Sequence, residues 1–171
     1  EDMHLTTGGR ATDTRLPIVA QYRAQAQELL ATGAVQRGLM VAAAAELQYS
    51  MFLDAQYADT YLILGDLYRQ LNMPAEAAVT YATGIRVKPT LLSDSQLSAR
   101  VSFLSGAHQL WPLAQAYRAI IAETNATLAR TDTVLRETTV NTLRTRLADT
   151  SQMLGYIEIL QGNDADAIEA Y

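Results

Sequence analysis

The stretch ADTYLILGDLYRQLNMPAEAAVTYATGIRVKP, residues 58–89, contains two apolar-periodic runs separated by a turn signal. Apolar residues recur at helical spacing from Ala58 to Leu71 and again from Ala75 to Val87. Pro74 suits the first turn of the second run, because the N–H that proline lacks would have no partner there. Pro89 cannot continue that run and therefore ends it. The stretch predicts two antiparallel helices joined by a tight turn.

Large and small residues follow a fixed pattern over these two helices. The pattern-bearing residues are Tyr61, Leu64, Gly65, Tyr68, Ala77, Tyr81, Gly84 and the closing Pro89. On these residues the stretch resembles a tetratricopeptide repeat (TPR), a helical hairpin that occurs in tandem arrays. We expect Gly65 to be small because the two helices approach closely there. We expect Gly84 to be small so that the next repeat can dock.

Segments before and after residues 58–91 also resemble the TPR motif, but fewer of their residues match it. Near the C-terminus Leu154-Gly155 and Ala167 match the motif, whereas Glu158 stands where the family has an aromatic residue. No glycine or proline occurs between Pro112 and Gly155, and leucines recur at helical spacing from about Asp132 onward, which predicts one unusually long helix. Residues 1–15 are polar and aperiodic. We divide the chain into a disordered arm, 1–15, and a TPR-like domain, 16–171, with approximate units 24–57, 58–91, a degenerate 93–128, a long helix 132–160 and a partial repeat 148–171.

The predicted fold class is all-α. No alternation of apolar and polar residues competes with the helical pattern. The resemblance implies a right-handed superhelix of antiparallel helical hairpins, an α-solenoid, with one irregular, lengthened helix. We expect the pitch of the superhelix to change around residues 125–147, where the extra length lies. The chain starts without methionine and ends inside a repeat pattern, so we expect it to be a fragment of a larger, bacterial-looking protein.

Composition narrows the function classes. The net charge is −5, which argues against the basic surface that nucleic-acid binding requires. The chain has no cysteine, so disulfides, thiol catalysis and cysteine-ligated metals are excluded. No apolar run is long enough to span a membrane. The compartment stays open between cytoplasm and periplasm, and any membrane tether would have to come from flanking segments.

The resemblance implies a binding groove lined by the first helix of each repeat. The groove-facing positions would be Asp59, Leu62, Ile63, Asp66, Arg69 and Gln70 on repeat 58–91, and Gln25, Glu28, Leu29 and Thr32 on the preceding one. This mixed apolar and acidic surface predicts a partner peptide or helix with apolar anchors and some positive charge. Packing of Leu62 and Ile63 against a neighbouring helix is the alternative.

Catalytic and metal-binding patterns are absent from the sequence. The two histidines, His4 and His108, have no neighbours at ligand spacing, and no carboxylate pair or phosphate-binding glycine loop occurs. His108 fits a helix C-terminus, where its charge would complement the dipole. We therefore expect no cofactor, no metal and no enzymatic activity. An enzyme with its site in the irregular region 125–147 is the least favoured interpretation.

The leading hypothesis is a protein–protein interaction or scaffolding domain whose partner is an unspecified protein or peptide. The alternative is a binding module for a non-protein ligand such as a glycan, attached to a membrane or surface-polysaccharide enzyme, which the resemblance permits. Exposed aromatic side chains lining a groove would favour the glycan. The apolar face of the long helix leaves a homodimer seam as an alternative to intramolecular packing.

Overall fold

The computed structural model describes residues 37–91, 94–130 and 137–170, together with the helical residues Gln21, Ala24 and Glu28. Within these residues all regular structure is helical and no strand occurs, which confirms the all-α class. The helices with assigned bounds are α2 (Arg37–Leu53), α3 (Ala58–Gln70), α4 (Pro74–Val87), α5 (Asp94–Gly106), α6 (Trp111–Arg130), α7 (Glu137–Gln161) and α8 (Asp164–Ala170).

Helix boundaries follow the proline and glycine signals in the sequence. Helix α4 begins with Pro74 in its first turn, and Pro112 is the second residue of α6. The predicted long helix is α7, with 25 residues. Its expected start at Asp132 lies outside the described residues, as does the arm of residues 1–15.

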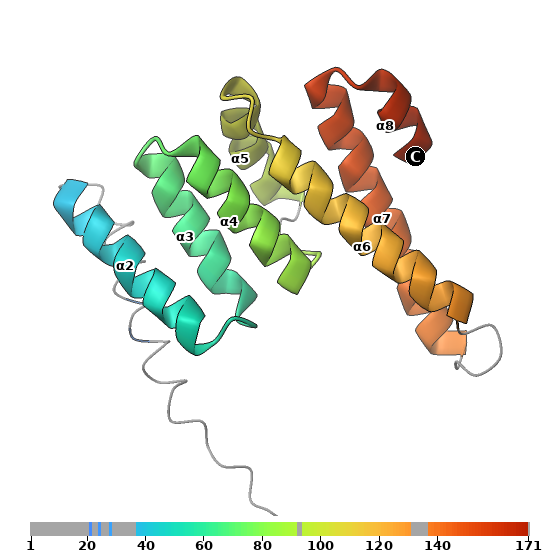
Figure 1. Ribbon diagram of the computed structural model, residues 1–171, viewed down its shortest axis with the longest axis horizontal. Helices are drawn as coiled ribbons and strands as arrows, with labels where there is room; N and C mark the ends of the chain where they lie inside the picture. The colour runs from blue at the N-terminus through green and yellow to red at the C-terminus, as the bar shows by residue number, and fades with distance from the viewer. Residues whose placement is uncertain are drawn as a thin grey trace, which may run out of the picture.

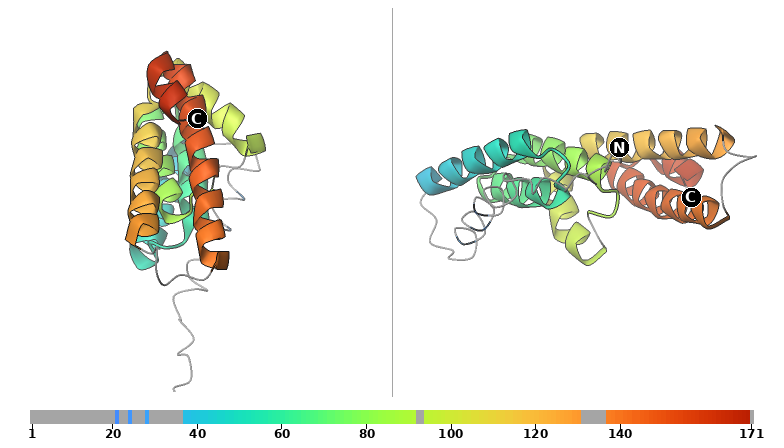
Figure 2. Two further views of the ribbon diagram at one scale, coloured as in Figure 1. Left: turned by 90° about the vertical axis from the view of Figure 1, so that its right-hand side faces the viewer. Right: turned by 90° about the horizontal axis from the view of Figure 1, so that it is seen from below.

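The helices form an elongated row with two sides (Figures 1 and 2). Seen from below, α2, α4 and α6 lie along one side, and α3 and α7 lie along the other (Figure 2, right). Helix α3 packs against α2 and α4, α4 packs against α6, and α7 packs against α6 and α8. Helix α5 projects outward from between α3 and α7 and touches α3, α4 and α7. The unit 93–128, in which the motif is degenerate, therefore departs from the side-by-side hairpin of α3 and α4.

Two glycine–tyrosine contacts hold α3 and α4 together. A Cβ placed on Gly65 of α3 would lie 2.6 Å from Cδ1 of Tyr81 on α4, which confirms the close approach expected there. A Cβ on Gly84 of α4 would lie 2.7 Å from Cβ of Tyr61 on α3 and 2.5 Å from Cδ2 of Leu91. The expectation for Gly84 is therefore corrected: its small size admits Tyr61 of the same hairpin, not a following repeat.

Three helix–helix turns share one backbone arrangement. Each has a residue with positive φ within two residues of the helix end: Asn72 (57°), His108 (55°) and Gly162 (77°). In each turn the next N–H donates to the carbonyl five residues back, at 2.8–2.9 Å, and the positive-φ N–H donates to the carbonyl three residues back. This is the Schellman motif, which satisfies the last carbonyls of a helix. His108 thus serves as a left-handed C-terminal residue, a role that sequence reasoning missed.

A continuous apolar core runs along the row from α2 to α7. Tyr81 and Tyr117 are among its largest fully buried side chains. Burial raises the pKa of both phenols above their ordinary value, and the Asp66 carboxylate raises the pKa of Tyr81 further.

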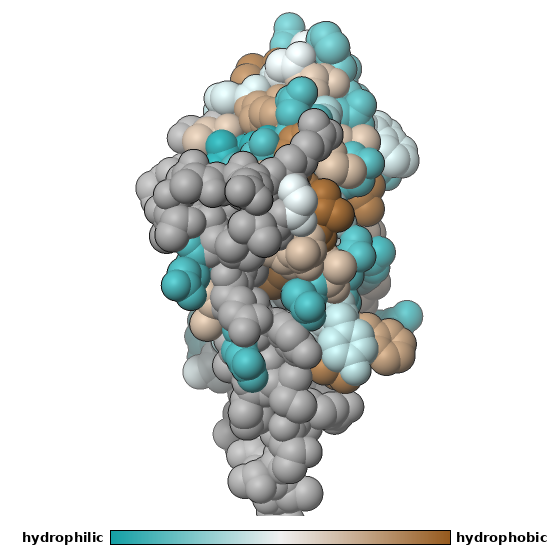
Figure 3. Space-filling view, turned by 90° about the vertical axis from the view of Figure 1, so that its left-hand side faces the viewer, coloured by the Kyte–Doolittle hydropathy of each residue, from teal (hydrophilic) through white to brown (hydrophobic). Residues whose placement is uncertain are grey.

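The α2 end of the molecule shows hydrophobic residues scattered among hydrophilic ones (Figure 3). On α2 the rings of Tyr49 and Phe52 stack, with their centroids 6.4 Å apart.

Candidate partner-binding surfaces

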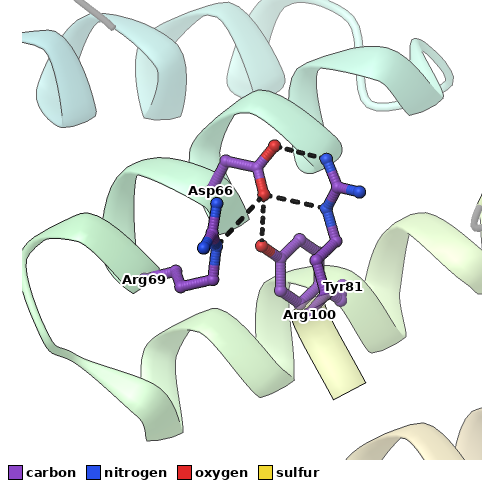
Figure 4. Close-up of polar contacts among 4 residues, drawn as sticks. All are labelled: Asp66, Arg69, Tyr81 and Arg100. Carbon is purple, nitrogen blue, oxygen red and sulfur yellow. Dashed lines mark hydrogen bonds and ion pairs between the residues drawn. The ribbon is translucent and has the colours of Figure 1, made fainter. Parts of the chain in front are cut away.

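Asp66, a predicted groove residue, lies at the centre of a polar cluster that joins three helices (Figure 4). Its carboxylate accepts hydrogen bonds from Nε of Arg100 at 2.8 Å, Nη2 of Arg100 at 2.6 Å and the hydroxyl of Tyr81 at 2.7 Å. Nε of Arg69 lies 3.7 Å away. The pair with Arg100 is largely shielded from water, with side-chain exposures of 19% for Asp66 and 14% for Arg100. In this arrangement Asp66 fastens α5 to α3 and α4.

The other predicted groove residues fall into different environments. Ile63 is a buried member of the core, and Leu62 is half-buried against it. The expectation that Ile63 faces a groove is thus corrected in favour of the alternative, packing against neighbouring helices. Asp59 and Arg69 are half-buried and Gln70 is exposed.

On the preceding unit, Glu28 is helical and exposed. The remaining predicted residues there, Gln25, Leu29 and Thr32, lie outside the described residues. A binding role for the exposed members of the predicted set stays a prediction.

A second surface emerges when the last helical hairpin is compared with α3 and α4. Leu154-Gly155 follows Leu64-Gly65 by 90 residues, and Ala167 follows Ala77 by the same interval. At this interval Tyr156 and Ile159 occupy the places of Asp66 and Arg69. Large apolar side chains are exposed on this hairpin: Tyr156 (37%), Ile159 (50%), Leu160 (38%) and Ile168 (79%). We call these four residues the α7–α8 apolar surface.

The contrast between equivalent positions is greatest at Ile168. Its counterpart Ala78 is fully buried beneath neighbouring helices, whereas Ile168 is 79% exposed. Complete burial of a large apolar side chain is favourable by on the order of 2 kcal/mol. An exposed side chain such as that of Ile168 does not gain this free energy. Grouped exposed apolar residues mark interaction sites on protein surfaces. Large exposed apolar side chains therefore lie on α7 and α8 and not at the predicted groove positions of α3.

Glu158 fixes the position of this surface. Its side chain is fully buried, and its Oε1 lies 2.8 Å from Nη2 of Arg118 on α6, an ion pair that lacks hydrogen-bond geometry. Oε2 accepts a hydrogen bond of 2.8 Å from the amide of Asn163. The same Arg118 atom donates to Asp166 of α8 at 2.9 Å. Glu158, which departs from the TPR pattern, thus joins α7 to α6, and Arg118 in turn joins α6 to α8.

A third feature is a groove between α4 and α6 with a volume of about 660 Å³. Much of its lining is apolar, and it also includes the polar residues Gln56, Thr83, Arg86 and Gln115 and the aromatic Trp111. Trp111 is 64% exposed and Val79 is 58% exposed. Nη2 of Arg86 donates to Oε1 of Glu123 on α6 at 3.0 Å. In the sequence, Trp111 before Pro112 indicates only the start of a helix, because the sequence does not tell which side of α6 faces α4.

Neither a metal centre nor a membrane span was found in the parts of the chain that the structure describes. No three histidine, aspartate or glutamate side chains there group closely enough to hold a metal ion. None of the helices in those parts combines the length and the apolar character needed to cross a bilayer. Comparison of the chain with protein-family models, with curated proteins and with solved structures finds no match.

Proposed function

We propose that this chain is a TPR-type helical repeat domain that acts as a protein-interaction or scaffolding module. The observation that carries the proposal is the α7–α8 apolar surface, four large apolar side chains exposed on one hairpin. In the equivalent hairpin, Ala78 is covered by neighbouring helices and Asp66 is engaged by Arg100. A surface of this kind gains free energy when a partner covers it.

The spacing of the exposed residues favours a helical or extended peptide as the partner. Tyr156, Ile159 and Leu160 lie three and four residues apart on α7, so they share one face of that helix. Acidic residues Asp164 and Glu169 are exposed on the neighbouring α8. We infer a partner segment with apolar anchors that fit between these side chains and with basic residues near the acidic ones.

The rigid support of the surface also favours binding. Ion pairs of Arg118 with Glu158 and Asp166 fix the angle between α7 and α8, because they link both helices to α6. Apolar anchors held in a fixed arrangement lose less conformational entropy when a partner binds. Substitutions at Tyr156 and Ile159 are expected to leave these ion pairs intact, since neither side chain takes part in them.

The test is selection of peptides from a random display library on the purified chain, followed by affinity measurement with two variants. Tyr156→Asp/Ile159→Asp places charges in the proposed site. Phe52→Asp is the matched control, because Phe52 on α2 is also exposed. We expect selected peptides to lose at least about tenfold in affinity, roughly 1.4 kcal/mol, with the double variant and to keep their affinity for the control. Equal binding to all three proteins, or failure to select any peptide, would refute the proposal.

A further inference from the structure

The α4–α6 groove presents the only tryptophan of the chain to solvent. Trp111 is the first residue of α6 and is followed by Pro112, whose ring restricts the backbone at this point. Most of the indole is exposed, although tryptophan brings a large gain in free energy when it is buried. Four tyrosines, by contrast, lie in the core: Tyr61, Tyr68, Tyr81 and Tyr117. The Trp111 ring therefore projects from the first turn of α6 into solvent and does not pack in the core.

The polar groups in the groove are mainly uncharged. Gln56 and Gln115 carry side-chain amides, which provide both donors and acceptors. The hydroxyl of Thr83 donates to the carbonyl of Val79 at 2.8 Å, so its oxygen can still accept a hydrogen bond. The charged member, Arg86, is paired with Glu123 at 3.0 Å. This compensation favours an uncharged ligand with several hydroxyl groups.

The shape of the groove favours a small elongated ligand over a protein segment. Its volume of about 660 Å³ lies within the range of small-molecule sites. Helices α4 and α6 run in the same direction (Figure 1), and Gln115 follows Trp111 by four residues, about one turn, on α6. Both walls are helical, so an extended peptide would find few free main-chain groups to pair with. The Trp111 ring and the neighbouring side-chain amides suit a ligand made of linked rings, each with an apolar face and polar groups at its edge.

We propose that the α4–α6 groove binds a neutral oligosaccharide, with the indole of Trp111 stacked on the C–H face of one sugar ring. The amides of Gln56 and Gln115 bind the hydroxyl groups of the units that follow along the groove. This site shares no lining residue with the α7–α8 apolar surface and does not depend on the function proposed for that surface. Binding is a recognition event with no covalent step.

The test uses Trp111 as its own reporter, because no other tryptophan contributes to the emission. The full chain is titrated with three neutral hexasaccharides of different linkage: maltohexaose, cellohexaose and the hexamer of N-acetylglucosamine. We expect a saturable shift of the emission to shorter wavelength with at least one of them. Gln115→Ala, which leaves the reporter in place, should weaken that binding about tenfold. Gln152→Ala on α7 is the matched control and should bind as the unaltered chain does.

Calorimetry with Trp111→Ala completes the test, since that variant should lose binding while its helical circular dichroism is retained. Absence of a saturable change with all three hexasaccharides would overturn the inference, and so would equal affinity of the Gln115→Ala variant. A shift of Trp111 emission by the selected peptides, but not by the sugars, would also overturn it by assigning the groove to a protein partner. Tyr156→Asp should leave sugar binding unchanged, so failure of the peptide site and failure of the groove can be told apart.

Discussion

Gly65 of α3 and Tyr81 of α4 are packed so closely that no side chain fits between the Gly65 backbone and the tyrosine ring. The same ring donates its hydroxyl hydrogen to Asp66, the residue next to Gly65, at 2.7 Å. The ring is fully buried, so it has little room to move aside. One tyrosine therefore sets both the distance between the two helices and the position of the Asp66–Arg100 pair.

Replacement of Gly65 by alanine should destabilise the chain, because the added methyl group would lie 2.6 Å from Tyr81 Cδ1. We expect a loss of about 1–3 kcal/mol in the free energy of unfolding, as in other overpacked cores. Gly106→Ala is the matched control, since a Cβ there meets no atom within 4 Å. Urea unfolding of the three proteins measures the difference. A Gly65→Ala protein as stable as the control would show that α3 and α4 lie farther apart than described.

Tyr117→Phe should leave the stability unchanged or raise it. The Tyr117 hydroxyl is buried and has no hydrogen-bond partner among the residues that the structure describes, so its removal relieves a desolvation cost of about 1–3 kcal/mol without breaking a contact. Tyr81→Phe is the contrasting variant, because it breaks the hydrogen bond to Asp66 and should cost about 1 kcal/mol. Thermal unfolding of both variants gives the order of stabilities. The reverse order would contradict the hydrogen-bond assignment of these two phenols.

His108→Gly should stabilise the chain. His108 has a φ of 55°, in the left-handed region that disfavours residues with a Cβ. We expect a gain on the order of 1 kcal/mol in the free energy of unfolding from the relief of this strain. Ala107→Gly, one residue earlier and outside the left-handed region, should give no such gain. Chemical denaturation compares them. Stabilisation by both substitutions, or by neither, would argue against the Schellman turn.

Stability should fall when the pH rises above about 10, the ordinary pKa of tyrosine. Burial raises the pKa of Tyr81 and Tyr117 in the folded state, so in that range the unfolded chain releases protons that the folded chain retains. Each such phenol should lower the free energy of unfolding by about 1.4 kcal/mol per pH unit. Urea unfolding between about pH 8 and about pH 11 measures this slope. Tyr117→Phe should make it shallower, and an identical slope would contradict retention of the Tyr117 proton.

Sequence reasoning placed the helices well because their ends are marked locally. Pro74 and Pro112 can join a helix only at its first turn, and Gly162 follows the end of α7. Such signals depend on the backbone of a few consecutive residues. The packing of Gly65 on Tyr81 could also be predicted, since the small and large residues of the motif describe the contact directly.

The candidate site was harder to predict because it depends on contacts between distant residues. Asp66 looks like a groove residue in sequence, but Arg100, 34 residues further on, occupies its carboxylate. Burial of Ile63 depends in the same way on neighbouring helices. The exposed Tyr156 could have been found from its position 90 residues after Asp66, within the matching Leu154-Gly155 segment.

The most direct test of the proposed partner site is to map a selected peptide onto the chain by backbone NMR chemical-shift perturbation. We expect the largest changes to cluster around Tyr156, Ile159, Leu160 and Ile168 on α7 and α8, with small changes elsewhere. The largest changes along α3, in the α4–α6 groove or on α2 would contradict it.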